Sequence, residues 1–119
     1  MSTINEVAWL SELGVKPEDR QALEALVPEM VEETKKTEPG TRAYQFYSRE
    51  NAILVYERYA DSNAALEHMK NFGEKFAGRF MALVTPVSFT LLGSPSPELL
   101  AVVGPIGAVV NIPLGGYVI

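Results

Sequence analysis

The 119-residue sequence contains no cysteine and a single histidine, His68. Without cysteine the chain has no disulfide, thiolate nucleophile, cysteine-ligated zinc or iron–sulfur cluster, which fits a reducing compartment. One histidine rules out a metal site built from several histidines of one chain. No apolar run reaches the roughly 18 residues of a membrane span, and residues 1–6 lack the basic stretch of a signal peptide. We therefore expect a cytoplasmic protein with no metal and no membrane partner.

Positive charge is also scarce. The chain has ten Lys and Arg residues and 15 Asp and Glu residues, which gives a formal net charge of −5 at pH 7. The basic residues are scattered, and only Lys35 and Lys36 are adjacent. Because nucleic-acid binding needs a basic face, we expect no nucleic-acid partner.

The hydrophobic pattern predicts the order strand, helix, strand, strand, helix, strand, which is the ferredoxin-like arrangement. Strands are expected at 7–15, 41–47, 52–59 and 84–92. The first helix enters at Pro17, and Pro28 predicts a kink or two short helices within it. The second is capped by Asp61 or Ser62, and its buried stripe comprises Leu66, Met69, Phe72, Phe76 and Phe80. A short helix capped by Ser96 and strand-like pieces at 108–112 and 117–119 follow.

Both faces of the hairpin formed by residues 41–59 are largely apolar. A four-residue turn at 48–51 would place Arg42 opposite Glu57 as an ion pair and put Tyr44, Phe46, Ile53, Val55 and Tyr59 on one face. The chain's own helices can cover that face. For the other face, with Tyr47, Leu54 and Tyr56, we expect a second copy of the sheet across a two-fold axis. The alternative cover is the C-terminal segment.

Four segments match a known family pattern: Lys16-Pro17-Glu18, Glu38-Pro39-Gly40-Thr41-Arg42-Ala43-Tyr44, Glu57-Arg58-Tyr59 and Ala64-Ala65-Leu66-Glu67-His68-Met69. Over residues 7 to 91 the chain resembles the antibiotic biosynthesis monooxygenase family. The resemblance implies an α+β, ferredoxin-like antiparallel sheet with helices on one face. Two such sheets would pack across a homodimer as a dimeric α/β barrel. We expect this domain at 1–93, and at 94–119 an extension with a short helix and strand, packed on the same domain or on the partner subunit.

The resemblance also implies an activity, a cofactor-independent monooxygenase that oxidises a small aromatic, quinol- or anthrone-like substrate with O2. Two positions depart from the family pattern, since Tyr59 replaces the usual tryptophan and Val55 replaces an asparagine that holds substrate or oxygen in cofactor-free members. They favour the alternative, a non-catalytic dimeric module that binds a small hydrophobic ligand. A structural protein without a pocket is a third interpretation. Haem degradation is disfavoured, because no histidine follows His68 in the second helix.

His68 is the only side chain that titrates near neutrality without help, and we predict that it removes a phenolic proton from the substrate. The alternative is a half-buried histidine bonded to the backbone. Tyr59 is the second predicted catalytic residue, and the predicted substrate-binding residues are Trp9, Tyr44, Val55, Phe72 and Phe76. Tyr44 and Tyr59 either line one pocket or are core residues. Trp9 is a pocket wall, a dimer anchor or core.

Overall fold

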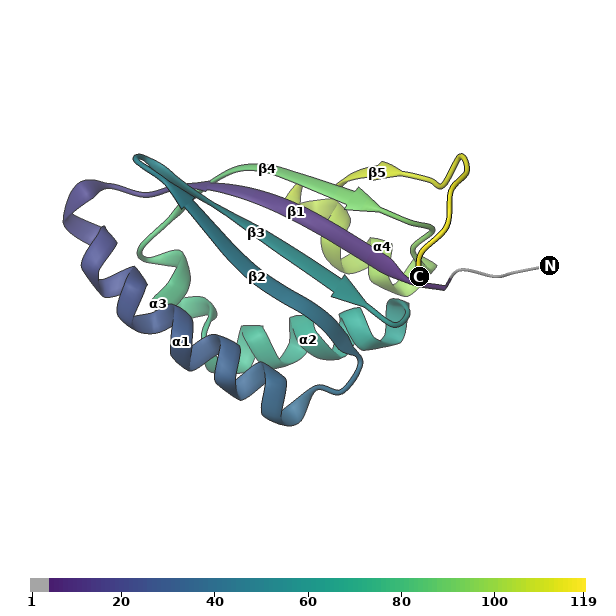
Figure 1. Cartoon of the computed structure of the whole chain (residues 1–119), viewed down its shortest axis with the longest axis horizontal. Coiled ribbons are helices and arrows are strands. Elements are labelled where there is room, and N and C mark those ends of the chain that lie inside the picture. The colour runs from purple at the N-terminus through teal and green to yellow at the C-terminus, as the bar shows by residue number, and fades with distance from the viewer. Residues whose placement is uncertain (1–4) are drawn as a thin grey trace.

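The computed structural model describes residues 5–119 and contains one five-stranded sheet of order β2-β3-β1-β4-β5 (Figure 1). Its strands are β1 (Val7–Gly14), β2 (Thr41–Arg49), β3 (Ala52–Tyr59), β4 (Thr85–Leu92) and β5 (Val109–Asn111). β1 to β4 pair antiparallel, and β5 runs parallel to β4. This order confirms the α+β ferredoxin-like fold. Residues 1–4, part of the start that was expected to lack a signal peptide, lie outside the described residues.

The helices are α1 (Arg20–Thr37), α2 (Ser62–Lys75), α3 (Ala77–Met81) and α4 (Pro97–Val103), with short 3-10 turns η1 (Pro17–Asp19) and η2 (Gly104–Ile106). α1 and α2 lie side by side under one face of the sheet (Figure 1). The predicted caps are confirmed: Asp61 accepts a hydrogen bond from the Ala64 N–H at 2.8 Å, and Ser96 accepts one from the Leu99 N–H at 3.1 Å. Within residues 5–119 no helix has the length and apolar character needed to cross a membrane.

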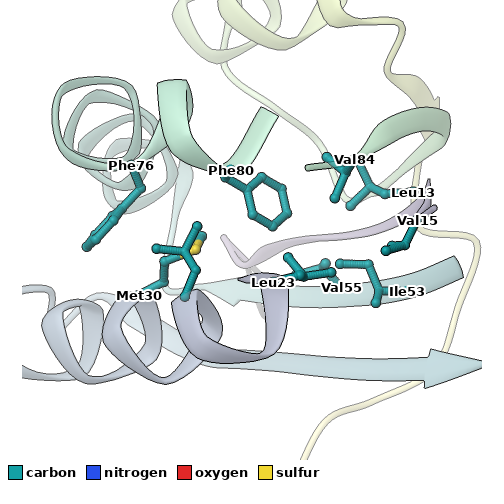
Figure 2. Close-up of a cluster of buried hydrophobic side chains, with 10 residues drawn as sticks. Leu13, Val15, Leu23, Met30, Ile53, Val55, Phe76, Phe80 and Val84 are labelled. Carbon is teal, nitrogen blue, oxygen red and sulfur yellow. The ribbon is translucent and has the colours of Figure 1, made fainter. Parts of the chain in front are cut away.

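Two clusters of buried side chains fill the space between sheet and helices. The first joins α1 and α3 to the sheet and includes Leu23, Met30, Val55, Phe76 and Phe80 (Figure 2). The second lies nearer β4, where α2 and α4 meet the sheet, and comprises Val7, Trp9, Tyr59, Ala65, Leu91, Leu99 and Val103. α4 therefore extends the helical layer rather than covering the opposite face of the sheet.

The predicted hairpin turn was wrong in length. Arg49 pairs with Ala52, so the turn has two residues instead of four, and Tyr44 instead of Arg42 lies opposite Glu57. An irregularity between Thr41 and Ala43 displaces Arg42 from the ladder, and the predicted Arg42–Glu57 pair does not form. The face assignment is unaffected, because a shift of two residues preserves the alternation of side chains. Ile53, Val55 and Tyr59 accordingly face the helices and are buried.

Three helix and strand predictions also need correction. α1 continues through Pro28, so of the two alternatives predicted there, a kink or two short helices, the second is wrong. The carbonyl that loses its partner there belongs to Glu24, an exposed residue, where water can satisfy it. The second predicted helix is divided into α2 and α3 at Phe76, whose φ of −130° is not helical. Residues 117–119 form no strand.

Candidate functional site

A cavity of about 470 Å³ lies between the sheet and helices α2 and α3. Aromatic and aliphatic side chains dominate its wall, to which β1, β2, β3 and β4 all contribute. Five of the seven predicted site residues line it: Trp9, Tyr44, Val55, His68 and Phe72. The polar groups on the wall belong to Trp9, Ser11, Tyr44, Glu57, His68 and Ser88. The cavity is therefore an apolar chamber with few polar groups, as small-molecule sites commonly are.

The other two predicted residues lie outside the cavity wall. Tyr59 is fully buried behind it, with its ring 4.8 Å from Trp9 and 5.4 Å from His68, centroid to centroid. Its hydroxyl donates a hydrogen bond to Glu57 Oε1. Phe76 packs at the Met30 end of the first buried cluster (Figure 2), and the Arg79 guanidinium lies 5.5 Å from its ring. Tyr59 therefore contacts wall residues of the cavity without lining it, whereas Phe76 is not part of the cavity wall.

His68 lies between two buried carboxylates. Its Nδ1 is 2.8 Å from Glu38 Oε1, and its Nε2 is 3.1 Å from Glu57 Oε1. Glu38 is the C-cap of α1, Glu57 lies on β3 and His68 lies on α2. Three elements therefore meet at one imidazole. Thr41 donates to Glu38 Oε1 at 2.9 Å, and Asn71 donates to Oε2 at 3.1 Å. We call Glu38, His68 and Glu57 the charge cluster.

Contacts within the charge cluster shift the pKa values of His68 and Glu38. Burial alone would lower the pKa of His68, but the hydrogen bonds and charges of Glu38 and Glu57 outweigh it and raise the pKa to about 9. Burial would raise the pKa of Glu38, but the His68 bond and charge, with the bonds from Thr41 and Asn71, lower it. At neutral pH His68 is therefore an imidazolium whose two N–H groups donate to carboxylates.

The same charges act on two tyrosines. Burial, followed by the charges of Glu57 and Glu38, raises the pKa of Tyr44, whose ring meets His68 edge-on at 5.0 Å. Burial and Glu57 also raise the pKa of Tyr59 well above its usual value. Both phenols stay protonated across the physiological range, so they can donate hydrogen bonds but cannot act as bases.

Among the polar atoms of the cavity wall without a hydrogen-bond partner, two belong to neighbouring residues of β2 and β3. Both contacts of Glu57 end on Oε1, and no donor among residues 5–119 reaches its Oε2. The Tyr44 hydroxyl likewise has no hydrogen-bond partner within this range, and neither atom is fully enclosed. Tyr44 and Glu57 are directly opposite on β2 and β3. The cavity therefore offers one acceptor and one donor side by side.

Sequence reasoning missed Glu38 and Glu57 as site residues. Glu57 alternates with Val55 and Tyr59 on the buried face of β3, and a carboxylate at such a position was the available signal. Glu38 gives no local signal, because its meeting with His68 spans 30 positions of the chain. Among residues 5–119 no group of three or more acidic or histidine side chains is arranged to hold a metal ion.

Comparison with known proteins identifies the family. The family model described as antibiotic biosynthesis monooxygenase matches residues 7–76, more than half of the chain. The chain therefore belongs to the antibiotic biosynthesis monooxygenase family. No curated protein matches it significantly.

Solved structures share the fold. MupZ from Pseudomonas fluorescens is 21% identical with a TM-score of 0.83, over 96% of this chain and 94% of that one. Rv0793 from Mycobacterium tuberculosis is 28% identical with a TM-score of 0.64, over 76% of this chain and 96% of that one. SnoaB from Streptomyces nogalater, a cofactor-independent oxygenase, is 16% identical with a TM-score of 0.57, over 77% and 95%. Because the MupZ likeness covers 96% of this chain, it includes most of residues 94–119.

Proposed function

We propose that this protein is a cofactor-independent monooxygenase that oxidises a small aromatic hydroxy compound, quinol- or anthrone-like, with O2. One observation carries the proposal: the Glu57 carboxylate, held by His68, presents a free Oε2 to an apolar cavity. Family membership and the fold shared with SnoaB, a cofactor-independent oxygenase, support the same class of reaction.

The geometry favours Glu57 over His68 as the base. Both nitrogens of His68 donate to carboxylates, and a pKa of about 9 keeps the ring charged at neutral pH. Glu57 Oε2, in contrast, is an unoccupied acceptor on the cavity wall. In this proposal His68 is a positioning residue that orients the Glu57 carboxylate. Tyr59 helps to hold the same carboxylate through its hydrogen bond to Oε1.

The reaction needs no external reductant. Glu57 removes the proton of the substrate hydroxyl or of its enol form, which leaves an electron-rich anion that can transfer an electron to O2. In an anthrone-type substrate a ring methylene becomes a carbonyl: one atom of O2 enters the product, and the other leaves as water with the two hydrogens of the methylene. The Tyr44 hydroxyl is placed to donate to the oxygen that carries negative charge.

Oxygen uptake with a panel of hydroquinones and anthrones tests the proposal. We expect uptake above the enzyme-free rate, and Glu57→Gln should lower kcat/KM by about 10²- to 10⁴-fold, the usual contribution of a positioned base. Glu33→Gln is the matched control, because Glu33 lies on α1 and pairs with Lys75 at the surface. No uptake with any compound, or an unchanged rate in Glu57→Gln, contradicts the assignment.

A second function is favoured by Val55. This apolar side chain lines the cavity where cofactor-free relatives carry an amide, so the chamber lacks that hydrogen-bonding group. Such a chamber suits a dimeric module that binds a small hydrophobic ligand without turning it over. Native mass spectrometry that shows a retained ligand, together with no oxygen uptake, would favour this function over the oxygenase.

We also infer that the protein is a homodimer joined through the face of the sheet opposite the helices. Leu10, Tyr47 and Leu92 are exposed on that face, and Leu54 and Tyr56 are half-buried. The C-terminal segment reaches only one end of it, where Val118 shares a shallow groove with Tyr56 and Leu92. Sedimentation at micromolar concentration should give a dimer, and Leu54→Arg should give a monomer. A wild-type monomer at this concentration contradicts the inference.

A further inference from the structure

The wall of the cavity divides into a deep end and a rim. At the deep end Trp9, His68 and Glu57 expose at most 9% of their surface. Three apolar residues of the same wall are far more exposed: Met81 by 43%, Ile106 by 49% and Val87 by 61%. They belong to α3, η2 and β4. The cavity therefore opens between these three elements, and a ligand enters past them.

Ile106 is the rim residue that comes from the C-terminal extension. Like Met81 and Val87 it lies beyond the residues 7–76 that match the family model, and of the three it alone follows β4. α4 anchors this part of the rim, because Leu99 and Val103 of that helix are fully buried. Gly107 closes η2 by donating its N–H to the Gly104 carbonyl at 2.9 Å, with a φ of +101° that favours glycine. Ile106 is thus held in place at the opening.

The deep end determines which end of a ligand enters first. Two carboxylates and one imidazolium leave the charge cluster with a net negative charge, which repels an anionic head group. Beside the charge cluster, the Glu57 Oε2 acceptor and the Tyr44 hydroxyl are free and belong to opposite residues of β2 and β3. A neutral hydroxyl can donate to Glu57 and accept from Tyr44 at once. A ligand bound in this way directs its apolar body toward the rim.

We propose that Ile106 is a specificity residue that sets the length of the apolar body of a hydroxyl-bearing ligand bound head-first at Glu57. This inference rests on the ligand site proposed above, but not on its oxygen chemistry. The C-terminal extension thereby adapts the shared family chamber to ligands of a particular length.

A series of 4-alkylphenols, from methyl to hexyl, tests this proposal by titration calorimetry in oxygen-free buffer. In the wild-type protein we expect Kd to fall by about fourfold with each methylene that is buried, until the chain reaches the rim and the gain stops. Ile106→Phe should move this break to a shorter chain, and Ile106→Ala should move it to a longer one. Leu100→Ala is the control, because Leu100 is exposed on α4 and does not line the cavity.

The possible failures can be told apart. An unchanged break in both Ile106 variants overturns the role of Ile106 and leaves the proposed site intact. If no alkylphenol binds the wild-type protein, the proposed site and this inference fall together. Matched 4-alkylbenzoates should bind more weakly than the phenols because of the negative cluster. Equal binding by the two series overturns the head-first orientation.

Discussion

Residues 38–68 bury an imidazole in contact with two carboxylates, whereas residues 99–119 contain no charged side chain and expose many apolar ones. In the first segment Glu38, Glu57 and His68 are all buried. In the second, Ile112, Leu114 and Tyr117 are exposed to solvent. Buried charge is costly unless fully paired, so its presence beside a cavity indicates chemistry. Exposed apolar surface indicates contact with another surface.

Removing the cation of the charge cluster should have the largest effect on stability. His68→Ala leaves Glu38 and Glu57 buried without a positive partner, and we expect a loss of about 3–5 kcal/mol in the free energy of unfolding. Urea denaturation at neutral pH measures it. Lys75→Ala, which breaks an exposed pair with Glu33, is the control and should change little. If His68→Ala lowers the free energy of unfolding as little as Lys75→Ala does, water must solvate the Glu38 and Glu57 carboxylates.

The pH dependence of stability should be nearly as large. His68 has a usual pKa of 6.5 that folding raises to about 9, so its contribution is complete below pH 6.5 and is lost as the pH rises through 9. The free energy of unfolding should fall by up to about 3 kcal/mol across this interval, at 1.36 kcal/mol per pKa unit. The Glu38 contribution has the opposite sign: it is present above a pH of about 4.5 and disappears as the pH falls below it. Thermal or urea denaturation from pH 4 to 10 measures both.

The His68→Ala variant serves as the control for this profile. It should lose the fall between pH 6.5 and 9, because no imidazole remains to lose a proton. An equal fall in the variant would assign the pH dependence to other groups. The wild-type maximum is expected between about pH 4.5 and 6.5, where both contributions are complete.

A smaller effect should follow from a change at Gly40, two residues after Glu38. A Cβ on Gly40 would lie 2.6 Å from the Ala64 Cβ, because the start of β2 packs closely on α2. Gly40→Ala should therefore cost about 1–3 kcal/mol. Gly73→Ala is the matched control, since a Cβ there meets nothing within 4 Å and the site is helical; it should stabilise by up to about 1 kcal/mol. Equal effects of the two changes would contradict the close packing of β2 on α2.

Much of the fold could be predicted because its signals are local. Alternation placed Tyr44, Val55 and Tyr59 on the buried face, and side-chain caps placed the starts of α2 and α4. The polar turn at Ser48-Arg49-Glu50-Asn51 contains no glycine, so composition did not decide between two and four residues. That choice determined the cross-strand partner of Glu57, and the wrong register paired this carboxylate with Arg42 instead of Tyr44.

The local pattern placed Glu57 on a buried face, but it could not predict that Glu38, His68 and Glu57 meet. His68 was singled out for its titration, but its partners come from a helix end and from the third strand, and only the folded chain brings them together. The same holds for Ile106, which follows helix α4, beyond the residues 7–76 that match the family model, and still lines the cavity. Periodicity assigns a residue to a face but not to a neighbour on another element.

The smallest effect on stability is expected in residues 99–119, which carry no charged side chain. It tests whether their exposed apolar side chains contact another surface. Ile112 is 71% exposed, so Ile112→Ser should change the free energy of unfolding by no more than about 0.5 kcal/mol in dilute protein. If a second copy covers this segment, the wild-type protein should gain more stability than the variant as protein concentration rises. Thermal unfolding at nanomolar and micromolar concentrations separates the two contributions. A loss above about 1 kcal/mol at every concentration would place Ile112 within its own chain's packing, and the exposed apolar segment would then need no partner.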